Sequence, residues 1–186
     1  LASFKESGKF IVAYGDQYSQ ELYYLATVAD KLILNPQGSI GWHGLASTPV
    51  FYKDLLEKIG VEMQVFKVGT YKSAVEPFIA TEMSDANREQ LTEMLDSTWD
   101  ELLTAVSASR GVSKEKLNGY ADRFMDFCTA EEYVACGMAD TLLYKDGVQA
   151  YLKSLTGVGG DDDLNLVTME TMKERLKLNK MVEDAA

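Results

Sequence analysis

The sequence contains few of the residues from which metal sites and histidine-dependent active sites are made. It has one histidine, His43, and two cysteines, Cys128 and Cys136, among 186 residues. The cysteines are not in a metal-type spacing, and one imidazole cannot complete a zinc site with them. We therefore expect no metal and no cofactor, and we interpret the cysteines as small buried hydrophobic side chains rather than as a disulfide.

The sequence also lacks long hydrophobic runs and an excess of basic residues. No run approaches the ~18 consecutive apolar residues of a transmembrane helix, and residues 1–5 do not resemble a secretory signal. With 18 basic against 29 acidic side chains the net charge is −11, which argues against nucleic acid or an anionic membrane surface as the main ligand. A hydrophobic content of 46% and a charged content of 25% are typical of a soluble globular domain.

Several common catalytic patterns are missing. A serine–histidine–acid triad would depend on His43, and the nucleophile pattern Gly-x-Ser-x-Gly is absent because Gly38–Gly41 has the wrong spacing. The glycine-rich run Gly157–Gly160 precedes three aspartates, which repel phosphate rather than bind it. No acidic pair stands out by position for glycosidase chemistry. The sequence therefore favours neither a triad nor nucleotide binding.

Strand-like and helix-like segments alternate along the chain, which predicts an α/β fold with a mostly parallel sheet and right-handed crossovers. The predicted strands are Phe10–Tyr14, Lys31–Leu34, Val61–Phe66, Met138–Tyr144 and 164–168. The predicted helices are 18–29, 50–59, 84–110, 114–117, 146–155 and 169–184, with a further helix begun by the capping-box pattern Thr129–Glu132. Asn35–Gly38 is expected to close the second strand.

Composition also divides the chain. We expect residues 1–156 to form one partial domain, 157–163 to be a flexible linker of glycine and aspartate, and 164–186 to begin a connection to a further domain. Residues 1–5 look like the end of a helix, so the first strand–helix segment of the fold is expected to be missing.

Lys72 is the candidate catalytic residue. It follows an apolar, alternating run and lies close to Glu76-Pro77, which restricts the loop. A lysine, whose ordinary pKa is near ~10.4, becomes a useful base only where burial lowers that pKa by several units. Four apolar neighbours could exclude water in this way: Phe66, Val68, Val75 and Phe78. A neutral lysine can then take the proton of a serine hydroxyl, as in a serine–lysine dyad.

The segment Val68–Phe78 resembles the lysine-bearing segment of the signal peptide peptidase A (protease IV) family. Further segments resemble the N-terminal half of the long, tandem-duplicated form of this family, in the same order, and together the likeness covers residues 10–155. These segments are Tyr18–Gln20, Tyr23–Ala26, Ala29–Lys31, Asn35–Gly38 and His43–Gly44. Thr129–Asp140 is similar to the closing helix and strand of crotonase-like and Clp-type folds.

This resemblance implies a crotonase/Clp-protease-like fold and a role for Lys72 as general base, with Thr70, Tyr71 and Ser73 in supporting positions. The family's nucleophile lies in an Ala-Ser-Gly-Gly-Tyr segment, and counting from Gly15-Asp16 places Gln20 where that serine would be. Ser19 is one residue away, which turns a helical side chain by roughly 100°, and Ser39 lies three residues early. Both are weak alternatives.

The resemblance further implies a bacterial, membrane-associated peptidase that degrades hydrophobic signal-peptide remnants on the outer face of the inner membrane, with its anchor outside this chain. The nucleophile and the oxyanion hole would lie in the C-terminal half of the same protein, a homo-oligomer is expected, and this chain alone would be inactive. Two alternatives are an acyl-CoA hydratase or isomerase on the same fold and a non-catalytic assembly domain.

Overall fold

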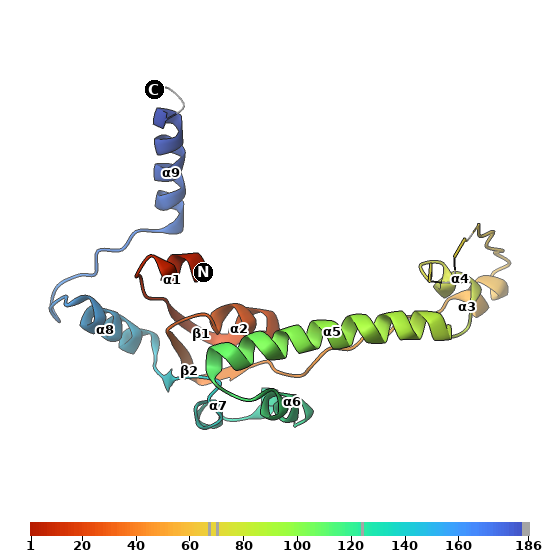
Figure 1. The fold of residues 1–186 in the computed structure, drawn as a ribbon, viewed down its shortest axis with the longest axis horizontal. Helices are drawn as coiled ribbons and strands as arrows, with labels where there is room; N and C mark the ends of the chain where they lie inside the picture. The colour runs from red at the N-terminus through yellow and green to blue at the C-terminus, as the bar shows by residue number, and fades with distance from the viewer. Residues whose placement is uncertain (67, 70, 124, 184–186) are drawn as a thin grey trace. The chain divides into compact units, whose positions relative to one another are not determined.

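The computed structural model describes residues 1–66, 68–69, 71–123 and 125–183, and Figure 1 shows the course of the chain. It forms two compact units, Leu1–Leu142 and Leu143–Ala186. The first unit holds the sheet and most of the helices. It begins with a short helix, α1 (Ala2–Glu6).

A three-stranded parallel sheet forms the centre of the first unit. Its strands are β1 (Val12–Tyr18), β2 (Lys31–Ile40) and β3 (Thr141–Leu142), in the order β1-β2-β3. Helix α2 (Gln20–Ala26) connects β1 to β2, which gives one strand–helix–strand crossover. The α/β fold class with a parallel sheet is confirmed.

Strand β2 continues past the turn that the sequence predicts after Leu34. The pairing jumps from Gly15 opposite Leu34 to Gln17 opposite Ser39, so residues 35–38 form a bulge inside the strand rather than its end. Proline is tolerated at such bulges, because the ladder is interrupted there. Gly38 is needed at this point, since a Cβ on it would lie 2.5 Å from the main-chain oxygen of Asp16.

The long helix α5 (Asp85–Arg110) has the ends that the sequence predicts. The Ser84 hydroxyl caps its first turn by accepting a hydrogen bond from the main-chain N–H of Asn87 at 3.2 Å. Gly111 ends it in the left-handed conformation with φ +67°. The buried residues Leu103 and Val106 belong to its second half, so the core lies under that half.

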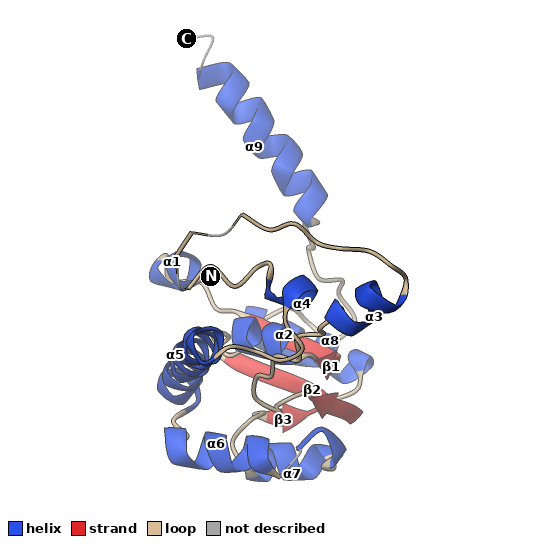
Figure 2. Cartoon of the chain, turned by 90° about the vertical axis from the view of Figure 1, so that its right-hand side faces the viewer, coloured by secondary structure: helices blue, strands red, loops and turns tan. Residues whose placement is uncertain are grey.

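Three short helices complete the surroundings of the sheet together with α2 and α5 (Figure 2). They are α6 (Lys114–Asp122), the 3₁₀ helix Met125–Phe127 and α7 (Ala130–Ala135). The capping box predicted at Thr129–Glu132 is present: the Thr129 N–H donates to the Glu132 carboxylate at 2.7 Å. The fully buried side chains of this core include Tyr23, Leu32, Ile33, Leu34, Trp42, Leu117, Met125 and Tyr133.

Two strands predicted within the first unit are absent or much shorter in the structure. Residues 61–66 form no strand, although they alternate, because no neighbouring strand is available to pair with them, and Phe66 is 98% exposed. They follow α3 (Lys53–Lys58) and lead towards α4 (Glu76–Ile79), so the second predicted crossover is not formed. The strand predicted at 138–144 is reduced to Thr141–Leu142.

The second unit contains α8 (Lys145–Thr156), which ends at Gly157 with φ +69°, and α9 (Met169–Glu183). Residues 157–168 contain no helix or strand, so the strand predicted at 164–168 is wrong. The domain boundaries predicted at 156 and 163 remain predictions. None of the helices in the described residues combines the length and hydropathy that crossing a membrane requires.

Candidate active site

The Lys72 segment is a tight turn between α3 and α4, beside the first turns of α5 (Figure 1). Gly69 adopts φ +104°, the Ser73 N–H donates to the Tyr71 carbonyl at 3.1 Å, and the Glu76 N–H donates to the Ser73 carbonyl at 2.9 Å. These main-chain bonds fold the loop back on itself. Of the predicted supporting residues, Tyr71 and Ser73 lie in this turn, and Thr70 lies outside the described residues.

Glu76 attaches this turn to the beginning of α5. Its side chain is only 4% exposed, and its carboxylate accepts from the Ser84 hydroxyl at 2.6 Å and from the Asn87 amide nitrogen at 3.0 Å. A carboxylate at this position is favoured by the partial positive charge of a helix N-terminus. The loop that carries Lys72 is thereby fixed to the first turn of α5.

Two further contacts support the same segment. The Tyr71 hydroxyl donates to the Glu89 carboxylate at 3.3 Å, one turn further along α5. The rings of Tyr52 and Phe78 stack with their centroids 6.1 Å apart, which joins the start of α3 to α4. The turn is therefore held on both sides, while its tip stays open.

Lys72 itself is exposed. It makes no hydrogen bond or ion pair with any other residue in the described ranges. Of the four apolar neighbours expected to exclude water from it, Phe66 is 98% and Val68 82% exposed, while Val75 is half-buried and Phe78 stacks on Tyr52. The apolar environment that a basic lysine requires is thus not built by this chain alone.

A second polar site surrounds Gln20, the first residue of α2. Its side chain is 3% exposed. Its Oε1 atom accepts from the main-chain N–H groups of both His43 and Gly44 at 3.1 Å, and its Nε2 atom donates to the Gly44 carbonyl at 3.1 Å. The amide is satisfied on both sides, so it holds the loop after β2 firmly against α2.

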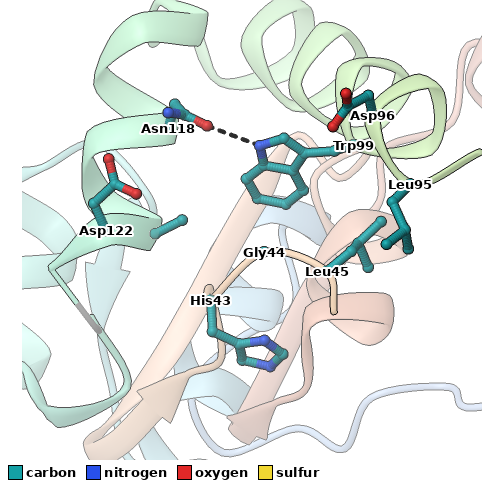
Figure 3. A pocket seen from close by; sticks show the side chains of 9 residues that line it. His43, Gly44, Leu45, Leu95, Asp96, Trp99, Asn118 and Asp122 are labelled. Atoms are coloured by element: carbon teal, nitrogen blue, oxygen red, sulfur yellow. Dashed lines mark hydrogen bonds between the residues drawn. The ribbon is translucent and has the colours of Figure 1, made fainter. Parts of the chain in front are cut away.

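A pocket of about 360 Å³ adjoins this loop (Figure 3). His43, Gly44 and Leu45 form one wall and Leu95, Asp96 and Trp99 of α5 another, with Asn118, Ala121 and Asp122 completing it. The Trp99 indole N–H donates to the Asn118 side-chain oxygen at 2.8 Å, which fixes the ring. The lining is partly apolar and partly acidic.

Comparison with known proteins decides the classification. Residues 3–159 match the family model described as Peptidase family S49. The chain belongs to this family. It is 45% identical over 130 residues to Protease 4 of Salmonella typhi and 32% identical over 176 residues to Protease 4 of Haemophilus influenzae. It is 30% identical over 167 residues to the chloroplastic serine protease SPPA of Arabidopsis thaliana.

These alignments cover 70%, 91% and 90% of this chain but only 21%, 29% and 24% of the respective relatives. The chain thus corresponds to between a fifth and a third of each of these family S49 proteins. Its fold is the Clp/crotonase-like fold of the family.

Within this S49 chain, the predicted catalytic residues are not all brought together. Tyr71, the residue before Lys72, bonds to Glu89 of α5, whereas the loop bonded to Gln20 lines a pocket with Trp99, about 15 Å further along the same helix. Ser19 caps α2: its hydroxyl accepts from the Leu22 N–H at 3.3 Å and donates to Glu21 at 2.8 Å. Ser39 lies in β2, opposite Gln17.

The sequence does not predict that Glu76 binds Ser84 and Asn87 at the start of α5. It predicts Ser84 as the N-cap of α5, but the bond from the Ser84 hydroxyl to a carboxylate eight residues earlier forms only because α4 folds back on α5. The only local indication of a buried carboxylate is that Glu76 is an acidic residue next to Pro77 in an otherwise apolar segment.

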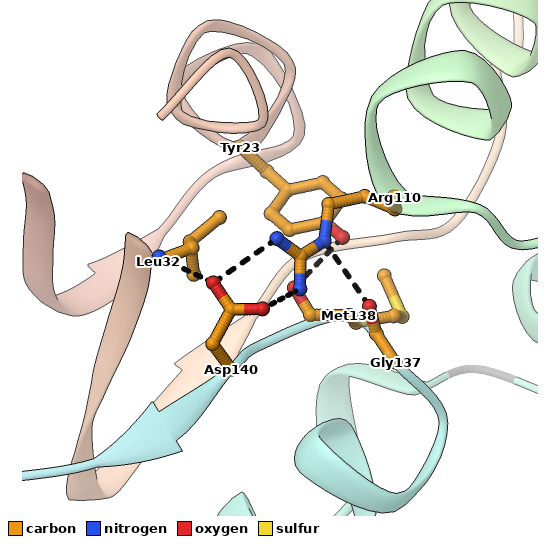
Figure 4. Close-up of polar contacts among 6 residues, drawn as sticks. All are labelled: Tyr23, Leu32, Arg110, Gly137, Met138 and Asp140. Atoms are coloured by element: carbon orange, nitrogen blue, oxygen red, sulfur yellow. Dashed lines mark hydrogen bonds and ion pairs between the residues drawn. The ribbon is translucent and has the colours of Figure 1, made fainter. Parts of the chain in front are cut away.

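A polar cluster around Arg110 is structural (Figure 4). Its guanidinium makes two contacts with the Asp140 carboxylate, at 2.7 and 3.2 Å, and donates to the Gly137 carbonyl at 3.1 Å. Asp140 also accepts from the Leu32 N–H at 2.7 Å, so the cluster joins the end of α5 to β2 and β3. Burial raises the pKa of Asp140. The hydrogen bonds and the positive charge of Arg110, together with the bond from the Leu32 N–H, lower that pKa by more than burial raises it, so it lies below its ordinary value.

The two cysteines are free thiols and half-buried, and burial raises the pKa of Cys128. In the described part of the chain, no three histidine, cysteine or acidic side chains converge in a way that could hold a metal ion.

Proposed function

We propose that this chain is the base-supplying part of a serine peptidase, in which Lys72 takes the proton of a serine hydroxyl. The proposal rests mainly on the way the Lys72 loop is held. In a chain of a peptidase family, Lys72 lies at the exposed tip of a loop that Glu76 fixes to the start of α5. Fixing the loop while leaving the amine accessible suits a base that acts on a group brought by another part of the protein.

The serine is expected outside this chain. Gln20 stands where the family resemblance places the nucleophile, and a carboxamide cannot attack a carbonyl carbon under these conditions. Ser19 and Ser39 have structural positions and do not approach Lys72. The C-terminal half of the same protein supplies the nucleophile in this proposal, and the isolated chain is inactive.

The proposed reaction follows from these placements. The neutral amine of Lys72 accepts the serine proton as the serine oxygen bonds to the carbonyl carbon of the peptide, and the resulting ammonium group gives that proton to the leaving amine as the C–N bond breaks. Water then attacks the acyl-serine ester, Lys72 accepts its proton and returns it to the serine oxygen, and the carboxylic acid product leaves. The exposed apolar side chains beside the turn, including Phe66 and Val68, would form the surface on which another part of the protein packs. A partner packed on them would exclude water from the lysine, which favours its neutral form.

The partners and substrates follow from the same family. We propose the C-terminal half, further copies of the protein and hydrophobic peptides such as signal-peptide remnants, with the peptidase held at the outer face of a bacterial inner membrane. The family match favours this peptidase over the acyl-CoA hydratase or isomerase alternative, which gives the Lys72 segment no role.

The test is peptide hydrolysis by the full-length protein with Lys72→Ala. General-base catalysis contributes about 10²–10⁴-fold, so kcat/KM should fall by that factor while the circular dichroism spectrum and oligomer size stay the same. Lys58→Ala, at the end of the nearby α3, is the matched control and should keep wild-type turnover. Unchanged hydrolysis by Lys72→Ala would instead support a non-catalytic assembly role.

A further inference from the structure

The loop that follows β2 holds two main-chain N–H groups that point at the side chain of Gln20. We propose that the main chain of His43 and Gly44 is a binding position for a peptide main chain, and that this protein keeps it closed with the side chain of its own Gln20. The inference depends on the Gln20 contacts and not on Lys72.

Two successive main-chain N–H groups point at one oxygen atom in this loop. The N–H groups of His43 and Gly44 both donate to Gln20 Oε1 at 3.1 Å. Gly44 has φ +80°, a left-handed conformation that lets consecutive N–H groups face the same side and form a concave site for a carbonyl oxygen or an anion. Paired N–H groups of this kind also hold the developing oxyanion in acyl transfer.

The Gln20 amide has only one orientation that satisfies these groups. With Oε1 towards the two N–H groups, Nε2 donates to the Gly44 carbonyl, whereas the reversed amide would set donors against donors. The side chain thus offers one carbonyl oxygen and one N–H, which is what a residue of an extended peptide offers along one edge. The site therefore matches peptide main chain in its donors and acceptors.

The loop is held in place by contacts that do not involve Gln20. Trp42 is fully buried, its main-chain N–H donates to Asp126 at 2.8 Å, and its indole N–H donates to the Leu117 carbonyl at 2.7 Å. The Gly41 N–H donates to the Tyr18 carbonyl at 2.8 Å. These bonds should preserve the two N–H groups in position when the Gln20 side chain is removed.

The adjoining pocket indicates which peptides the open site would take. His43 and Gly44 belong to both the N–H pair and the 360 Å³ pocket, whose walls are apolar at Leu45, Leu95 and Trp99 and acidic at Asp96 and Asp122 (Figure 3). A peptide bound to the N–H pair would direct a side chain into this pocket, which suits a side chain that combines an apolar stem with a polar or basic end. Gln20 therefore closes the main-chain position while the side-chain pocket beside it remains open.

The test is chemical rescue of Gln20→Ala with acetamide, which carries the missing carbonyl oxygen and N–H. Acetamide at roughly ten times its dissociation constant should raise the Tm of Gln20→Ala by about 3–5 °C more than that of wild type, in a saturable way. Asn87→Ala removes another buried amide, which is bonded to Glu76 rather than to paired N–H groups, and should not be rescued. Gln20→Met, which fills the space without an acceptor, should not be rescued either.

Gln20→Ser keeps the experiment decisive if Gln20→Ala does not fold, since it removes the same carboxamide, leaves nearly the same space and should respond to acetamide in the same way. Folding of either variant only in the presence of acetamide also supports the proposal. The proposal is overturned if folded Gln20→Ala shows no saturable gain over wild type, if Asn87→Ala gains as much, or if both Gln20 variants stay unfolded at every acetamide concentration.

Discussion

Ser84 donates a 2.6 Å hydrogen bond from its hydroxyl to the buried carboxylate of Glu76, and the same hydroxyl accepts from the Asn87 N–H to cap α5. One side chain thus begins the longest helix and also fixes the short helix that follows Lys72. The position of the proposed base is therefore coupled to the helix cap.

This coupling predicts that Ser84→Ala affects both stability and turnover. Loss of an N-cap costs about 1 kcal/mol, and the Glu76 carboxylate loses its shortest hydrogen bond, so the free energy of unfolding should fall by about 1–3 kcal/mol. Peptide hydrolysis by the full-length protein should fall as well, because the Lys72 turn loses its attachment. Urea denaturation and steady-state kinetics measure the two effects.

Ser113→Ala is the matched control. Ser113 caps α6 in the same way, by accepting from the Lys116 N–H at 3.4 Å, but α6 bonds to α5 at Trp99, well beyond the turns of α5 that hold the Lys72 segment. It should lose about 1 kcal/mol of stability and keep its turnover. Equal turnover in the two serine variants would contradict the coupling.

The Arg110–Asp140 pair predicts a large stability difference between two ion pairs of equal length. Arg110 and Lys114 both lie 2.7 Å from their carboxylate partners, but Arg110 is 8% and Lys114 38% exposed. Arg110→Ala leaves the half-buried Asp140 carboxylate without its cation and removes a buried side chain, and it should cost about 2 kcal/mol, less than the loss expected for a fully buried pair. Lys114→Ala should cost less than about 1 kcal/mol. Chemical denaturation that gives similar losses for both would refute this ranking.

The same pair predicts a pH dependence. Because the pKa of Asp140 is lower in the folded protein than its ordinary value of 3.8, the folded state binds this proton less tightly than the unfolded state. The stabilisation is therefore complete above pH 3.8 and is lost as the pH falls through the folded value. The free-energy difference between wild type and Asp140→Asn should shrink between pH 6 and pH 3, and a constant difference would argue against the assignment.

Replacing Gln20 with serine should not create a peptidase in this chain. Gln20→Ser places a hydroxyl where the family resemblance expects the nucleophile, but Lys72 lies beside another part of α5 and is exposed. A fluorophosphonate, which labels activated serines, should therefore react with Gln20→Ser no faster than with wild type. Rapid labelling at residue 20 would show that this chain can assemble a dyad by itself.

Local signals in the sequence predicted several helix ends, although the helix predicted at 114–117 extends to Asp122 and the one predicted at 18–29 is shorter. Ser84, Gly111 and Thr129 act through bonds within one turn of their own helices, so neighbouring residues suffice to identify them. The apolar neighbours of Lys72 and the Glu76-Pro77 step made it one plausible base among the lysines, and the family resemblance selected it.

What the sequence could not predict depends on residues far apart in the chain. Residues 61–66 alternate like a strand, but a strand forms only where another strand pairs with it. The bonds from Gln20 to His43 and Gly44 span more than 20 residues, and those from Asn87 and Ser84 to Glu76 need α4 to fold back on α5. Such contacts follow from the packing of whole elements and have no local pattern.

The central claim is that Lys72 activates a serine located elsewhere in the same protein, and fluorophosphonate labelling of the full-length protein tests it most directly. Wild type and Lys58→Ala should be labelled at one serine outside the segment described above, at equal rates. Lys72→Ala should be labelled at least about 10²-fold more slowly. Labelling of Lys72→Ala at the wild-type rate would contradict the account.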